Sequence, residues 1–181
     1  MLKKIAIISS NYASIKSFLS KQIEHLSKNY LVNIYTNIEN SEDLFGNMNK
    51  NIKFIHLPIK RNVNLFKDLE CFFKLIFFIF KFKPDLIMTL SPKGGLLGIL
   101  TSFILNVKIR IHYYTGQVWV TKKGFEKKLL KQVDKIIFKM STDCLTDSNL
   151  QKNFLENERV VKKDFLKVLA NGSICGVDTS R

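Results

Sequence analysis

Short apolar segments alternate with helix-like segments along almost the whole chain. The apolar segments are rich in Ile, Leu and Val and are bounded by polar or turn-forming residues, which is typical of buried strands. They predict strands at residues 5–8, 31–36, 52–57, 85–90, 108–114, 143–147 and 165–169. Because strands that alternate with helices pair in parallel through crossover connections, the pattern predicts an α/β fold with a parallel sheet of about seven strands.

Apolar spacing and stop signals define the helices. The longest is expected at residues 64–82, where Pro84 ends it because proline cannot continue a helix. Ser148 is placed to cap a helix at residues 149–156 with its hydroxyl group. A small apolar helix is expected at residues 96–105. Two amphipathic helices are marked by apolar residues at helical spacing, one by Phe18, Leu19, Ile23 and Leu26 and the other by Phe125, Leu129, Val133, Ile136 and Met140.

This order of elements describes one doubly wound, Rossmann-like parallel sheet, for which 181 residues are sufficient. In such sheets, ligands bind beyond the carboxyl ends of the strands. The turns that leave those ends begin at Ser9, Ser91, Thr115 and Asp147. Because the first, fourth and fifth strands are expected to be near neighbours, the first three of these turns are predicted to converge on one cleft.

The chain is strongly basic, with a formal net charge of +14 and a pI near 9.7. Such a charge indicates a polyanionic partner, which is a nucleic acid, an anionic membrane or a phosphorylated substrate, or else a set of solvated lysines. No nucleic-acid-binding motif is present and the aromatic residues fall mostly in core patterns, so nucleic acid is not expected.

The cysteines and the amino terminus indicate a cytoplasmic protein without a metal site. Cys71, Cys144 and Cys175 are odd in number and form no CxxC pair, which argues against disulfides and zinc. The apolar run that follows Lys3 and Lys4 is too short for a signal peptide and is interpreted as the first strand.

No GxGxxG motif follows the first strand, so a dinucleotide site is not expected. Two other segments have residues that suit phosphate or sugar ligands. The glycines at 94 and 95, after Ser91, Pro92 and Lys93, either form a phosphate cradle at a helix start or let that helix pack closely on the sheet. The loop after the fifth strand offers a hydroxyl, an amide and cations, which together suit a sugar phosphate. His112 lies in the strand just before this loop and Trp119 lies within the loop. Each of them is either a ligand contact or a core side chain.

Four segments in this order resemble the N-terminal domains of retaining family-four glycosyltransferases of the GT-B fold. The segments are residues 91–98, 110–124, 145–148 and 171–178. The resemblance is closest to the branch that builds bacterial O-antigen and capsule polysaccharides. It implies transfer of a sugar from a nucleotide-sugar donor to a glycan acceptor, often linked to polyprenyl diphosphate, at the cytoplasmic face of the cell membrane. No cofactor or metal is implied.

The resemblance assigns residues 1–170 to the acceptor-side domain and residues 171–181 to the start of the crossover to a donor-binding domain. We therefore expect the 181-residue chain alone to be inactive. Two alternatives are a non-catalytic, membrane-docking acceptor subunit whose donor half is a separate polypeptide, and an inactive truncated remnant. The candidate substrate-binding residues are Ser10, Asn11, Lys93, Gly94, Thr115, Gly116, Gln117 and Ser148.

The sequence departs from the family pattern after the fifth strand. Many relatives carry a His-Gly pair where this chain has Thr115 and Gly116, so that histidine has no equivalent here. His112, three positions earlier, is kept only as a candidate catalytic residue.

The helix at 64–82 is apolar on almost every side except for lysines seven residues apart, at Lys67, Lys74 and Lys81. One of its faces is expected to cover the sheet, which leaves a Phe-rich face that includes Phe73 and Phe77. This face suits the headgroup region of an anionic membrane, and full burial between neighbouring elements is the alternative. A second basic stripe, with the same two interpretations, comprises Lys127, Lys128, Lys131, Lys135 and Lys139.

Overall fold

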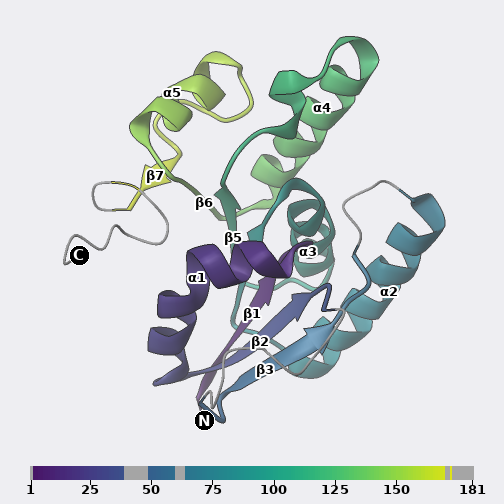
Figure 1. Ribbon diagram of the computed structural model, residues 1–181, viewed down its shortest axis with the longest axis vertical. Coiled ribbons are helices and arrows are strands. Elements are labelled where there is room, and N and C mark those ends of the chain that lie inside the picture. The colour runs from purple at the N-terminus through teal and green to yellow at the C-terminus, as the bar shows by residue number, and fades with distance from the viewer. Residues whose placement is uncertain (1, 39–48, 60–63, 170–171, 173–181) are drawn as a thin grey trace.

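The computed structural model describes residues 2–38, 49–59, 64–169 and 172. Its seven strands form one parallel sheet in the order β3-β2-β1-β4-β5-β6-β7 (Figure 1). The strands are β1 (Lys3–Ile8), β2 (Tyr30–Thr36), β3 (Ile52–His56), β4 (Leu86–Leu90), β5 (Ile109–Tyr114), β6 (Asp143–Thr146) and β7 (Lys167–Val168). Each lies within a segment predicted as a strand, apart from end shifts of one or two residues, and the parallel, doubly wound sheet is confirmed.

Helices connect the strands, and the one side-chain cap that the sequence predicted is present. They are α1 (Tyr12–Ser27), α2 (Leu65–Phe82), α3 (Pro92–Ile104), the short 3-10 helix η1 (Val118–Thr121), α4 (Gly124–Met140) and α5 (Asn149–Asn157). The Ser148 side chain accepts a hydrogen bond from the backbone N–H of Gln151, as predicted. At the end of α2, Lys83 takes a left-handed conformation (φ 52°) directly before Pro84.

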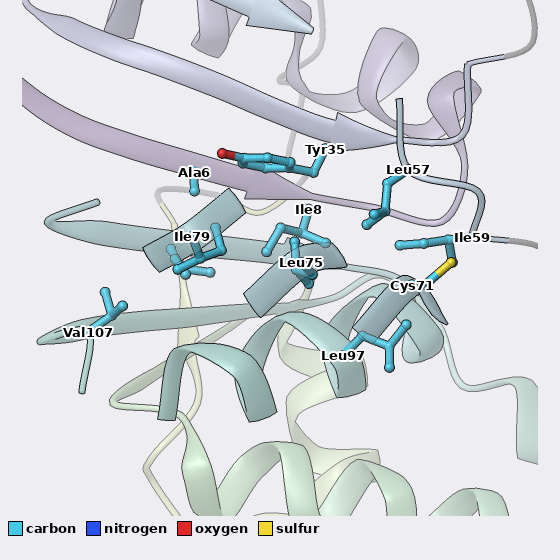
Figure 2. Close-up of a cluster of buried hydrophobic side chains, with 11 residues drawn as sticks. Ala6, Ile8, Tyr35, Leu57, Ile59, Cys71, Leu75, Ile79, Leu97 and Val107 are labelled. Carbon is cyan, nitrogen blue, oxygen red and sulfur yellow. The ribbon is translucent and has the colours of Figure 1, made fainter. Parts of the chain in front are cut away.

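Alternate residues of each strand pack on opposite faces of the sheet. Ile5 and Ile7 face α1, where they meet Ile15, Leu19 and Ile23. On the other face, Ala6, Ile8 and Tyr35 pack against Leu75 and Ile79 of α2 and Leu97 of α3, and Figure 2 shows these side chains converging between helix and sheet. A third cluster around Trp119 joins β5 and β6 to η1 and α5. Burial of each large apolar side chain stabilises the fold by about 1.5–3 kcal/mol.

The structure differs from the sequence-based expectation at two helices. First, α3 begins at Pro92 rather than near residue 96, so the glycines at 94 and 95 lie inside its first turn. Second, the predicted apolar stripe of α4 packs only in part: Phe125, Leu129 and Ile136 are exposed, whereas Val133 and Met140 are half-buried. Asp134 and Ile137 are buried instead, because η1 and α3 contact that side of α4. The expected crossover at 171–181 lies outside the described residues, except for Gly172.

Candidate functional site

The turns that leave β1 and β4 meet at the carboxyl edge of the sheet. Ser10 and Ser91 share a hydrogen bond of 2.8 Å between their hydroxyl oxygens, and the backbone N–H of Ser10 also donates to Ser91 Oγ at 3.2 Å. Asn11, the next residue, caps α1 by accepting a hydrogen bond from the Ala13 N–H at 2.9 Å. The predicted convergence of these two turns is therefore present.

Backbone geometry brings the start of α3 very close to the β1 turn. Ser91 has a positive φ of 66°, which is unfavourable for a residue with a side chain. A Cβ atom on Gly94 would lie 3.0 Å from both the backbone nitrogen of Ser10 and the Cα of Ser9. The glycine thus allows a close approach of helix and sheet, which is the packing interpretation of this motif.

Lys93, in the first turn of α3, is held by an ion pair with α2. Its Nζ lies 2.8 and 2.9 Å from the two carboxylate oxygens of Asp68 in the first turn of α2. Both side chains are largely buried, so the pair is protected from solvent screening. Any phosphate that contacts Lys93 competes with Asp68 for its ammonium group.

His112 is a core histidine in this structure. Its side chain is only 2% exposed, and its Nδ1 shares a 2.8 Å hydrogen bond with the hydroxyl of Thr89. Burial lowers the pKa of His112 to about 3, so the ring is neutral at physiological pH. Of the two interpretations that the sequence left open, this environment matches the structural one.

The loop after β5 carries polar groups to the same edge. Thr115 and Gly116 lie with Ser91 and Asp134 around one small pocket. Gln117 Oε1 accepts a 3.4 Å hydrogen bond from Gln151 Nε2, which ties this loop to the start of α5. The Gln117 Nε2 atom is buried and has no hydrogen-bond partner among the described residues.

Trp119 anchors this loop in the core. It is 1% exposed, stacks on Phe154 with ring centroids 5.5 Å apart, and donates a 2.7 Å hydrogen bond from Nε1 to the Asp134 carboxylate. Lys127 and Lys131 lie within 6 Å of the indole centroid, at 5.9 and 5.5 Å. Trp119 therefore has the packing role that the sequence left open.

Asp134 has an unusual environment for a carboxylate. Burial raises its pKa to about 6, partly opposed by the Trp119 hydrogen bond. The Tyr114 hydroxyl donates to the Asp134 backbone carbonyl at 2.9 Å. Asp134, whose carboxyl group has this raised pKa, is thus one of the residues that line the same small pocket as Thr115.

Three residues at this edge were not predicted from the sequence: Asp68, Asp134 and Gln151. Asp134 had a detectable signal: it shares a helix face with the apolar residues Leu130, Ile137 and Phe138, which marks a buried polar position. Gln151 accepts hydrogen bonds from the Thr146 hydroxyl and from the Asp147 N–H, both within five residues of it, and donates to the distant Gln117. Within the described residues, no cluster of three or more potential ligands is arranged for a metal ion.

The outer face of α2 is exposed and rich in phenylalanine. Phe73, Phe77 and Phe80 are 60%, 61% and 65% exposed. Lys67, Lys74 and Lys81 are exposed beside them. The Lys74 charge is matched by Glu70 at 2.5 Å, so the stripe is less basic than the sequence implies. In the part of the chain that the structure describes, no helix has both the length and the apolar character of a membrane span.

Comparison with known proteins relates the chain to enzymes of sugar metabolism. No family model matches it. Over 121 residues, 67% of the chain, it is 33% identical to the capsular polysaccharide biosynthesis glycosyltransferase CapM of Staphylococcus aureus. The chain spans about a third (32%) of the length of that relative.

Two solved structures share the fold at low sequence identity. The UDP-N-acetylglucosamine 2-epimerase of Rickettsia bellii matches 92% of the chain with a TM-score of 0.68 at 13% identity, over 44% of its own length. The UDP-GlcNAc 2-epimerase of Neisseria meningitidis, bound to UDP-GlcNAc, matches 94% with a TM-score of 0.65 at 17% identity, over 46% of its own length. The chain therefore has a Rossmann-like α/β fold and is similar in sequence to part of a capsular polysaccharide glycosyltransferase.

Proposed function

We propose that this chain forms the acceptor-side domain of a glycosyltransferase that moves a sugar from a nucleotide-sugar donor to a glycan acceptor in surface polysaccharide synthesis. The observation that carries the proposal is the 33% identity to the capsular polysaccharide glycosyltransferase across two thirds of the chain. We further propose that the chain belongs to the retaining family-four glycosyltransferases that build capsule or O-antigen.

The carboxyl edge of the sheet has suitable chemistry for a glycan. Thr115 and Ser91 line the same small pocket, and the Ser91 hydroxyl is hydrogen-bonded to that of Ser10. The Gln117 amide follows in the same loop as Thr115. Such groups donate and accept hydrogen bonds with sugar hydroxyls without a net charge. Gln117 is a further contact: its Nε2 donor lacks a partner among the described residues, and it would reach a sugar oxygen once the half-buried side chain turns outward.

A second Rossmann-like domain, on the same or on a separate polypeptide, closes over the carboxyl edge and holds the nucleotide sugar. The exposed Phe face of α2, flanked by Lys67 and Lys81, rests on the cytoplasmic surface of an anionic membrane. An acceptor linked to polyprenyl diphosphate would then reach the domain from the lipid surface.

Acceptor binding tests the proposal directly. Farnesyl-diphosphate-linked N-acetylglucosamine is titrated into isotope-labelled protein, and the backbone amide shifts are mapped onto the chain by NMR. We expect the largest shifts at Ser10, Thr115 and Gln117, and at least fivefold weaker binding after Thr115→Val or Gln117→Leu. The matched control is Thr121→Val, which removes an exposed hydroxyl in η1.

Two results would contradict the acceptor-side assignment. One is an absence of shifts at the carboxyl edge with the lipid-linked sugar. The other is equal weakening by Thr121→Val and Thr115→Val, which would mean that the hydroxyl at 115 makes no specific contact.

A further inference from the structure

A groove of about 890 Å³ lies at the amino edge of the sheet, opposite the candidate acceptor site. Strands β1, β4 and β5 begin there, and α2 and α3 end there. The volume is in the range of small-molecule sites, which is about 300–1,000 Å³. No role proposed above uses this groove.

The walls of the groove are apolar and incompletely covered. They include Ile5, Leu26, Phe80, Ile104 and Ile109. Phe80, Ile104 and Ile109 are 65%, 51% and 43% exposed, although each belongs to a residue type that favours burial. An alkyl chain lying along these side chains would remove apolar surface from water on both partners, which is favourable by about 25 cal/mol per Å².

The groove also adjoins the exposed face of α2. Phe80 lines the groove. It lies three residues, about one turn, after Phe77 and seven residues, two turns, after Phe73, so the three share the outer side of α2. The apolar surface therefore continues from the outer face of α2 into the groove.

The charges around the groove are predominantly positive. Four lysines line it, and its one carboxylate, Asp85, accepts a hydrogen bond from the Lys4 N–H at 2.8 Å. The Lys4 ammonium donates to the Phe82 carbonyl at 3.0 Å, which neutralises the exposed end of α2. Lys3, Lys83 and Lys108 are exposed and form no ion pair with any described residue.

We propose that this groove binds the acyl chain of an anionic phospholipid, whose phosphate is held at the rim by Lys3, Lys83 and Lys108. An apolar cleft with a cationic rim is complementary to an anionic amphiphile in both shape and charge. A second copy of the chain is a poor occupant, because it carries the same net charge of +14 and would bring lysines against lysines. This inference goes beyond the proposed function and does not depend on sugar transfer.

The test uses a monomeric lipid, so that bilayer docking by α2 cannot contribute. Oleoyl lysophosphatidic acid, below its micelle concentration, is titrated into the full chain by calorimetry. Oleoyl lysophosphatidylcholine has the same chain with no net charge and serves as the comparison lipid. We expect one lysophosphatidic acid to bind per chain, at least tenfold more tightly than lysophosphatidylcholine.

Two sets of variants locate the site. Ile104→Glu with Ile109→Glu places carboxylates on the apolar wall and should abolish binding, whereas Leu129→Glu with Ile136→Glu makes the same change on the exposed face of α4 and should not. Lys83→Gln with Lys108→Gln should weaken binding at least tenfold. These lysines are exposed, so the second pair tests the site even if the glutamate pair disturbs folding.

Further comparisons separate this site from other surfaces. Phe73→Ser with Phe77→Ser removes the two phenylalanines of the outer face of α2 that do not line the groove, and should leave binding of the monomeric lipid unchanged. The proposal is overturned if no binding occurs, if the neutral lipid binds equally well, or if the groove variants bind like the wild type. A dimer that Ile104→Glu dissociates in sedimentation experiments would also overturn it.

Discussion

The imidazole ring of His112 occupies the space that a side chain on residue 95 would need. A Cβ atom built on Gly95 lies 2.4 Å from His112 Cε1 and 2.8 Å from Nδ1, far inside van der Waals contact. Gly95 belongs to α3 and His112 to β5, so this contact sets how closely the helix approaches the sheet. The start of α3, which carries Lys93 and Gly94 to the candidate site, is placed by this packing.

Gly95→Ala should therefore destabilise the protein although alanine favours helices. The helix preference is worth about 1 kcal/mol, and overpacking in a core costs about 1–3 kcal/mol. We expect a net fall in the free energy of unfolding, measured by urea denaturation. His112→Ala opens the space, so Gly95→Ala should cost little in that background. Equal costs of Gly95→Ala in both backgrounds would show that the ring is not the obstacle.

His112 should make the protein sensitive to acid. The pKa of His112 is about 3 in the folded chain and near 6.5 in the unfolded chain, so the unfolded state binds the extra proton between these values. The contribution of His112 to the free energy of unfolding should fall by up to about 1.4 kcal/mol per pH unit on acidification through this window. Unfolding is compared at pH 7, 6 and 5 with His112→Gln, which should show a shallower dependence. If the free energy of unfolding depends on pH equally in the wild type and in His112→Gln, burial does not lower the pKa of His112 as stated.

Asp134 should respond differently to two substitutions. Its raised pKa, about 6, means that the folded chain carries a costly buried carboxylate at pH 8, and the cost disappears as the pH falls toward 4. Asp134→Asn retains an acceptor for Trp119 Nε1 and should preserve or increase stability at pH 8. Asp134→Ala leaves that donor unpaired and should cost about 1–3 kcal/mol. Thermal melts in which the alanine variant equals or exceeds the asparagine variant would contradict this account.

Ser91 combines backbone strain with hydrogen bonds to Ser10. Ser91→Ala and Ser91→Gly both remove the hydroxyl, but only glycine also relieves the positive φ of 66°. We expect the glycine variant to be more stable than the alanine variant by about 1 kcal/mol in chemical denaturation. The opposite order would mean that Ser91 is not strained in solution.

The outer face of α2 should associate weakly with anionic vesicles. The triple substitution of Lys67, Lys74 and Lys81 with Gln should reduce co-sedimentation with phosphatidylglycerol vesicles, since each lysine near the surface contributes about 1 kcal/mol. Lys74 should contribute least, because Glu70 matches its charge. The control replaces Lys16, Lys21 and Lys28, which are exposed on the α1 side, with Gln. Equal loss in both variants would indicate non-specific attraction by the net charge.

Local sequence predicted the elements well because local forces decide them. The apolar runs of β1 and β4, the proline after α2 and the serine before α5 act within a few residues, and all these features appear where expected. Because parallel strands connected by helices align their carboxyl ends, the meeting of the Ser10 and Ser91 turns also followed from the order of elements.

The tertiary structure decided what each polar side chain does. Lys93 binds Asp68, 25 positions away, His112 is buried under α3, and α4 turns Asp134 rather than Phe125 toward the core. The groove at the amino edge likewise combines residues from β1, α2, α3 and β5. Periodicity shows that a helix has two faces, but which face is buried depends on the elements that pack against it. The sequence by itself determined where the chain forms strands and helices, whereas only the packing between them determined which charges are paired and which surfaces remain open.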